Sequence, residues 1–458
     1  MNSSEIADPP SPIPYATASD DGVSIDDSDG GPRMLSPISP SDAAEFIATL
    51  FPPSLSSQST FTLSLNLSPI SANPYLRTDN DRSLFNHYIH VVAKALCRSY
   101  DPDRNPFLVT ILPLAAASDM VTSVILTLSG CHWRRVYPSI WRCALTHQGQ
   151  AIKQVNNLLG CSDRQSIFEA CATILFLCLT ELFDGTSRVW KWHLKAASAI
   201  LKSPASQSIV TSSEWTFCVN LFHYLDSMST ISRCKAPLLH NNDAIAEIST
   251  SLHNSSLPRL DHSESADAIY GISPALFDLL GMVNLLANHR SRRVDELSEI
   301  GFRAAATHIG TRIDAWHADH DCSNVSGNAQ PHTDRAATAF EWAIRLRLHE
   351  IVEGYDPCHE FVERSVSFIL ESVQKIPYAS SVEGCLLFPL VIAGSSSVSV
   401  ERRMIVKERL MVMENTLGFS HIHYARQLLE TVWEGPASAA DFNWAAVRYC
   451  HFPGVVFI

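Results

Sequence analysis

The fold is decided by the stretch SDRQSIFEACATILFLCLTELFDG, which spans residues 162–185. Ser162 or Asp163 can cap the beginning of a helix here, and Gly185 can end it. The apolar run Cys171–Phe183 inside it contains an acidic residue and is shorter than the roughly 20 residues that a bilayer requires. The stretch therefore predicts a buried core helix rather than a membrane span.

Helical patterns continue on both sides of this stretch. In NPFLVTILPLA, Asn105 is suited to the N-cap and Pro106 to the first helical position, where its missing donor costs nothing. Four further segments show helical apolar spacing: HQGQAIKQVNNLLG (147–160), SRVWKWHLKAASAILKS (187–203), ISPALFDLLGMVNLLANH (272–289) and ERSVSFILESVQKI (363–376). The alternation typical of strands is rare. We therefore predict an all-α domain over residues 81–458, interrupted by a polar loop at 317–334.

Residues 1–80 have a different composition. They are rich in Pro and Ser and contain the acidic run DDGVSIDDSDGG at 20–31. Such a composition buries too little apolar surface to offset the entropy of ordering, so it predicts a disordered arm. Within it, SDAAEFIATLF (41–51) could form an amphipathic helical turn that docks on a partner, or it could be an incidental apolar cluster.

The composition of the whole chain limits its partners. Hydrophobic residues make up 46% and charged residues 18% of the 458 residues, which suits a large helical core. The net charge of −13 would repel a phosphate backbone, so it argues against direct DNA binding. MNSSEIADPPSPIP (1–14) has neither the basic start nor the apolar core of a secretory signal, so we expect no export, and the twelve cysteines are scattered. We expect them to be reduced and to pack as small apolar side chains.

No arrangement typical of catalysis is found. The sequence contains no nucleophile elbow and no glycine-rich phosphate loop. HEIVE (349–353) and HEFVE (359–363) each lack the second His of a metalloprotease motif. A set of possible metal ligands comprises His317, His320, Cys322 and His332, but its spacing fits no compact zinc module. We predict no catalytic residue, no cofactor and no metal site.

One segment could line a ligand pocket. In VWKWHLKAA, Trp190 and His193 share a helix face with Ala197, whereas Trp192 points elsewhere. This face either packs in the core, which is the ordinary fate of a buried Trp, or lines a pocket between helices.

Several stretches resemble those of a known family, and they occur in the family's order. They are LFNHYIHVVAKAL (84–96), YDPDRNPFLVTILPLA (100–115), VILTLSGCHW (124–133), ALTHQGQAIKQVNNLL (144–159), ATILFLCLTELFDGTSRVWKWHLKAASAIL (172–201), EGCLLFPLVIAG (383–394) and RQLLETVWEG (426–435). From about Leu84 to the C-terminus the chain resembles the fungal-specific transcription factor domain, in the branch of the acriflavine sensitivity control protein and its relatives. Phe388 stands where the family more often has Trp.

This resemblance implies an all-α regulatory domain, which in such proteins follows a DNA-binding zinc binuclear cluster. That cluster needs six closely spaced cysteines, whereas this sequence has no Cys-x-x-Cys and its first cysteine is Cys97. The family has no agreed catalytic residues to carry over.

The sequence therefore predicts a nuclear regulator of transcription that has no zinc cluster of its own. Either it acts through other transcription regulators or co-regulators, or the part that encodes the cluster is missing from this sequence. A small-molecule effector is compatible with this prediction, and the nucleus could be shared with the cytoplasm. The alternative is a cytosolic helical module that binds a ligand or protein and has left transcription; an enzyme is the weakest alternative.

Overall fold

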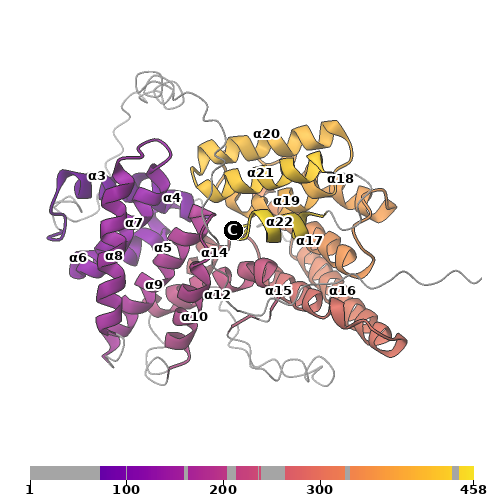
Figure 1. Cartoon of the computed structure of the whole chain (residues 1–458), viewed down its shortest axis with the longest axis horizontal. Coiled ribbons are helices and arrows are strands. Elements are labelled where there is room, and N and C mark those ends of the chain that lie inside the picture. Colours follow the sequence, from indigo (N-terminus) through magenta and orange to yellow (C-terminus); the bar gives the residue numbers. More distant parts are fainter. Residues whose placement is uncertain are drawn as a thin grey trace, which may run out of the picture. The chain divides into compact units, whose positions relative to one another are not determined.

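All regular elements in the computed structural model are helices, in the part of the chain that it describes (Figure 1). The described residues are 73–99, 101–158, 163–203, 213–235, 237–238, 264–324, 331–435 and 443–458. They belong to one compact unit, Leu67–Ile458. The predicted all-α fold is confirmed. The predicted docking segment at 41–51 and most of the predicted arm lie outside the described residues.

The first group of helices follows the chain from residue 79 to residue 201. Its elements are α3 (Asp79–His87), the π-helical turn η1 (Tyr88–Val92), α4 (Ala93–Leu96), the 3-10 turn η2 (Pro102–Arg104), α5 (Pro106–Val109), α6 (Ile111–Ala117), α7 (Asp119–Trp133), α8 (Ile140–Leu158), α9 (Arg164–Asp184) and α10 (Trp190–Leu201). Residues 73–78, which the sequence assigns to the arm, precede α3, and the Asn73 side chain donates to Thr122 Oγ1 at 3.0 Å. Asn73 is thus anchored to the helical unit through α7.

Helices α7 and α9 form the centre of this first bundle. Both are buried along most of their length, and they pack against each other, while α8 covers both and α10 covers α9. The caps of α9 are those that the sequence predicts: Asp163 accepts from the Ser166 N–H at 2.9 Å, and Gly185 is left-handed with φ of 78°. By length and composition α9 could cross a membrane, but 83% of its most apolar window is buried in the protein. It is a core helix, as predicted.

Asn105 has the capping role that the sequence predicts for it. Its side-chain oxygen accepts from the Phe107 N–H at 2.9 Å, and its amide donates to the Ala93 carbonyl at 2.8 Å. One buried side chain therefore begins α5 and also ties α5 to α4. Pro106 occupies the first helical position of α5.

The second group of helices lies C-terminal to residue 263. Its elements are α14 (Glu264–Tyr270), α15 (Pro274–Asn288), the 3-10 turn η3 (Arg290–Arg292), α16 (Glu296–Asn324), α17 (Pro331–Val352), α18 (Glu360–Gln374), the 3-10 turn η4 (Glu383–Leu386), α19 (Leu387–Ser395), α20 (Val400–Thr416), α21 (Ser420–Glu434) and α22 (Trp444–His451). In this second bundle α19 is buried from Leu387 to Gly394 and is surrounded by α17, α18, α20 and α21.

The predicted loop at 317–334 is wrong for its described residues. Helix α16 continues to Asn324 and α17 begins at Pro331, so helix occupies both ends of this segment. Its polar residues have partners: His317 bonds to Glu341 of α17 at 2.9 Å, and the His320 ring stacks on Trp316 of the same helix. Turn-forming composition was overridden here by polar contacts that the sequence does not reveal.

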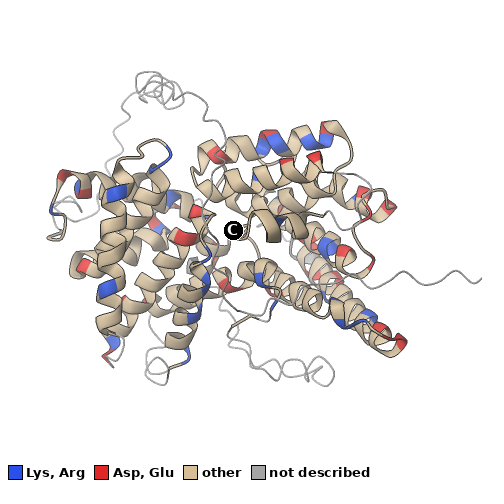
Figure 2. Ribbon diagram, viewed as in Figure 1, with Lys and Arg blue, Asp and Glu red and all other residues tan. Residues whose placement is uncertain are grey.

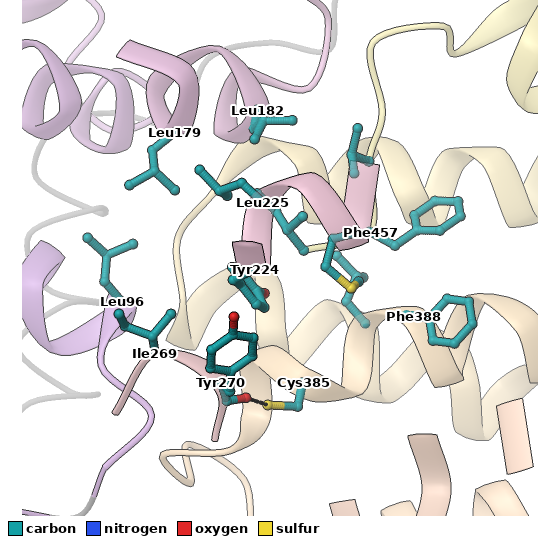
Figure 3. Close-up of a cluster of buried hydrophobic side chains, with 14 of the residues drawn as sticks. Leu96, Leu179, Leu182, Tyr224, Leu225, Ile269, Tyr270, Cys385, Phe388 and Phe457 are labelled. Atoms are coloured by element: carbon teal, nitrogen blue, oxygen red, sulfur yellow. Dashed lines mark hydrogen bonds between the residues drawn. The ribbon is translucent and has the colours of Figure 1, made fainter. Parts of the chain in front are cut away.

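Helix α12 (Ser213–Arg233) joins the two bundles, because it packs on α9 and α10 and also on α14 and α15. Figure 3 shows the buried cluster where they meet: Leu179 and Leu182 of α9 lie across α12 from Phe388 of α19, and the thiol of Cys385 donates to the Tyr270 carbonyl at 3.2 Å. The hydrophobic core is therefore continuous from one bundle to the other.

The last residues of the chain complete this shared core. Val455–Ile458 are buried, and Ser232 at the end of α12 donates to the Val455 carbonyl at 3.1 Å. The segment passes so close to the end of α9 that a Cβ on Gly454 would lie 2.5 Å from the carbonyl carbon and oxygen of Thr186. Only glycine fits at such an approach without a backbone shift.

Candidate functional site

The three residues predicted to line a pocket lie on α10, but mostly within the core. Trp190 and Ala197 are fully buried, His193 is half-buried, and Trp192 is 69% exposed, so the predicted face is the inner one. Trp190 Nε1 and His193 Nε2 are buried and have no hydrogen-bond partner in the described part of the chain. Such buried polar atoms need explaining, since most have a protein or water partner. The ligand pocket at this face stays a prediction.

The two His-Glu motifs come together in space, although the sequence discounts them as a zinc site. The rings of His349 and His359 lie 4.6 Å apart. The acidic residues of HEIVE have structural partners: Glu350 accepts from Trp444 at 3.1 Å, and Glu353 pairs with Arg303 at 2.6 Å. The first contact ties α17 to α22, and the second ties Glu353, which directly follows α17, to α16, so both carboxylates have structural partners.

A surface pocket of about 390 Å³ lies between the first bundle and α21. The residues that line it are Arg134, Arg135, Pro138, Trp141, Ser420, His423 and Tyr424. The first four come from the end of α7, the following turn and the start of α8; the others come from the first turns of α21. We call it the basic pocket. Sequence reasoning missed it, because its two halves are far apart along the chain and neither carries a motif.

The two arginines of the basic pocket are held by acidic neighbours. Arg134 pairs with Asp184 at the end of α9 and lies over the Trp141 ring, with its guanidinium carbon 5.1 Å from the ring centroid. Arg135 approaches Glu414 of α20 at 3.6 Å. These contacts fix the direction of both side chains at the mouth of the pocket.

Glu414 keeps a full negative charge behind the pocket. Burial alone raises the pKa of this carboxyl, but hydrogen bonds from His423 and Arg426 outweigh burial and lower the pKa to about 2. His423 Nδ1 lies 3.3 Å from the carboxylate, and Arg426 donates to it at 2.5 Å. Glu414 thus organises three basic side chains around itself, including Arg135.

The chemistry of the basic pocket suits an anion. Two guanidinium groups and an imidazole line it, each already paired with Asp184 or Glu414, and the N-terminus of α21, which has no side-chain cap, adds a positive helix dipole. Trp141 and Tyr424 add flat apolar surface beside these charges. A ligand or partner side chain that carries both an acidic group and apolar surface would match both features of this lining.

The remaining charge is spread over the surface. Figure 2 shows, in the view drawn, that Lys and Arg alternate with Asp and Glu along the helices and do not gather into one stripe. Many of these groups pair locally, for example Lys407 with Glu430 at 2.8 Å. A basic stripe is the usual footprint of DNA binding, and in this view the described helices do not display one.

The described chain is thus a large helical domain with a continuous core and a surface pocket lined by both charged and aromatic side chains. The sequence matches the fungal specific transcription factor domain over residues 83–453, and the chain belongs to this family. No curated protein and no solved structure is similar enough to count as a match. The family is one of transcription regulators, which work in the nucleus, and not a family of enzymes.

Proposed function

We propose that this chain is the regulatory domain of a nuclear transcription regulator and that it does not read DNA itself. The observation that carries the proposal is the family match, which spans almost the whole helical unit. The 458 residues contain no Cys-x-x-Cys, which the zinc binuclear cluster of such regulators requires, and their net charge is −13. DNA is then contacted by a partner regulator, or by a cluster encoded outside this sequence.

Chromatin immunoprecipitation tests this proposal. We expect the tagged chain to be enriched at promoters only when a regulator that carries a zinc cluster is present, and to lose that enrichment when the regulator is deleted. Absence of enrichment in every background would contradict the proposal.

The second candidate function is a cytosolic helical module that binds a ligand or a protein. It is favoured by the same acidic charge and by the basic pocket, neither of which requires a role in transcription. Fluorescent tagging separates the two candidates: a nuclear signal under at least one growth condition supports the regulator, and strict exclusion from the nucleus under all conditions supports the module.

The basic pocket is where we expect an effector or partner to act. Its two walls belong to α7–α8 and to α21, so an anion bound there would change how firmly the two bundles are held together. An Arg135→Ala variant should alter the response of a target promoter. Arg82→Ala is the matched control, because Arg82 is an exposed arginine outside the pocket that pairs only locally with Asp79. Equal promoter responses in the two variants would mean that the basic pocket has no role in regulation.

A further inference from the structure

Three side chains with metal-binding atoms converge where α3 meets α8. They are Asp81, Cys143 and His147, and their ligand atoms all lie within 4.8 Å of one another. His147 Nε2 is 3.0 Å from Asp81 Oδ1, and Cys143 Sγ is 4.0 Å from the same oxygen. Sixty-six positions separate Asp81 from His147, so sequence spacing cannot reveal the cluster.

The backbone positions these side chains as ligands. Cys143 and His147 are one helical turn apart on α8, so both project from the same face. Hydrogen bonds from the backbone hold the Asp81 carboxylate in place: its Oδ2 accepts from the N–H groups of Arg77 and Thr78 at 2.9 and 3.0 Å. Its other oxygen, Oδ1, lies next to His147 of α8. Metal-binding carboxylates are commonly oriented by such outer hydrogen bonds.

The spacing fits a tetrahedral ion. Zinc binds nitrogen and oxygen at about 2.0 Å and sulfur at about 2.3 Å, so two ligand atoms on one ion lie roughly 3.3 to 3.7 Å apart. The two separations from Asp81 Oδ1, 3.0 Å to His147 Nε2 and 4.0 Å to Cys143 Sγ, lie on either side of this range, and the third pair lies within 4.8 Å. Side-chain rotations would therefore have to bring the three ligand atoms onto one ion. Asp81 is buried, whereas Cys143 and His147 are half-buried, which leaves solvent access for an ion and for a fourth ligand.

Binding balances in protons as well as in charge. A divalent ion at this cluster would replace the proton of the Cys143 thiol, and that proton would be released to solvent as the metal–sulfur bond forms.

We propose that Asp81, Cys143 and His147 bind one divalent transition-metal ion of the zinc class, with water as the fourth ligand. The mixture of thiolate, imidazole and carboxylate suits such a borderline ion better than Mg²⁺ or Ca²⁺, which prefer oxygen ligands alone. The ion would link α3, the first described helix, to α8. This inference is independent of the proposed function.

The test uses the full chain, reduced, stripped of metal and titrated with Co²⁺ alone. One equivalent should produce the thiolate-to-cobalt charge-transfer absorption and the visible bands of tetrahedral cobalt, and Zn²⁺ should abolish both. Cys143→Ser should lose the charge-transfer absorption, and His147→Gln should weaken binding by at least about 10-fold. Cys450→Ser, which changes an exposed cysteine elsewhere, is the control and should behave as wild type.

A thermal melt provides a second measurement that does not depend on cobalt spectra. Zn²⁺ should raise the melting temperature of wild type and of Cys450→Ser, but not that of Cys143→Ser, whose near-isosteric side chain should leave the fold intact. If wild type gives no tetrahedral spectrum, or if Cys143→Ser keeps the charge-transfer absorption, the three residues form hydrogen-bond contacts only and the proposal is overturned.

Discussion

At the scale of single residues, Gly185 shows how one position can join two distant segments. It ends α9 with φ of 78°, and a Cβ there would lie 2.8 Å from the Cα of His421 in α21. A left-handed conformation costs an ordinary residue about 1–2 kcal/mol, and here the clash with backbone adds to that cost.

The corresponding prediction concerns two alanine substitutions. Gly185→Ala should lower the free energy of unfolding by at least about 2 kcal/mol, because it adds both strain and a clash. Gly149→Ala is the matched control: Gly149 lies inside α8, and a Cβ added there would meet no atom of the described residues within 4 Å, so the change should stabilise by roughly 0.5–1 kcal/mol. Urea denaturation of both variants measures the difference, and equal effects would contradict this account of Gly185.

Buried histidines make a second prediction at this scale, on pH. His87 Nε2 bonds to His132 Nδ1 at 3.0 Å, and His132 Nε2 lies 3.0 Å from the Leu417 carbonyl. Burial, and then the neighbouring His132, lower the pKa of His87 to about 3; burial foremost lowers the pKa of His132 to about 4.

The direction in which the free energy of unfolding changes with pH follows from proton uptake by the unfolded chain. Below the ordinary pKa of 6.5 these histidines are protonated in the unfolded chain but stay neutral in the folded one. Their contribution to stability is therefore complete above pH 6.5 and is lost as the pH falls towards 4 and 3. His87→Gln should reduce the slope of unfolding free energy against pH by about 1.4 kcal/mol per pH unit between pH 6 and 4. Identical slopes for variant and wild type would show that His87 does not contribute.

At the scale of elements, a buried ion pair ties η4 to α20. Glu383 Oε1 lies 3.1 Å from Arg409 Nη2, and both side chains are buried. Burial raises the pKa of Glu383 and lowers the pKa of Arg409, so each charge depends on the other. Glu383 also accepts from the Ala379 N–H at 2.9 Å.

We predict that Glu383→Gln lowers the free energy of unfolding by about 3 kcal/mol, because Arg409 is left buried and unpaired. The double variant Glu383→Gln/Arg409→Met should recover most of that loss, since it buries no unpaired charge. Thermal and urea denaturation of both variants and of wild type measure these differences in the free energy of unfolding. A double variant that is no more stable than the single one would mean that the pair is not coupled.

Element ends were predictable where local chemistry decides them. Asp163, Gly185, Asn105 and Pro106 have the positions that capping rules assign to them. The segment at 317–334 was predicted wrongly because its helices are stabilised by contacts across the pair, such as His317 with Glu341. A single sequence gives no sign of such contacts.

At the scale of the whole molecule, helical patterns predicted the all-α fold, which the helices of the described residues confirm. The order of the family's segments predicted the family, which the match over residues 83–453 confirms. The basic pocket was out of reach of sequence reasoning, because Arg135, in the turn after α7, and Ser420, at the start of α21, come together only in the tertiary fold. The Asp81–Cys143–His147 cluster was out of reach for the same reason. Its residues meet only where α3 packs near α8.

The central claim is that this domain regulates transcription once something else brings it to DNA. A tethering assay tests that claim most directly. The chain is fused to an unrelated DNA-binding domain, and a reporter that carries the matching site is compared with the same chain unfused. We predict that reporter expression changes with the fusion and stays at its basal level with the unfused chain. An inert fusion that is expressed, folded and nuclear would contradict the claim.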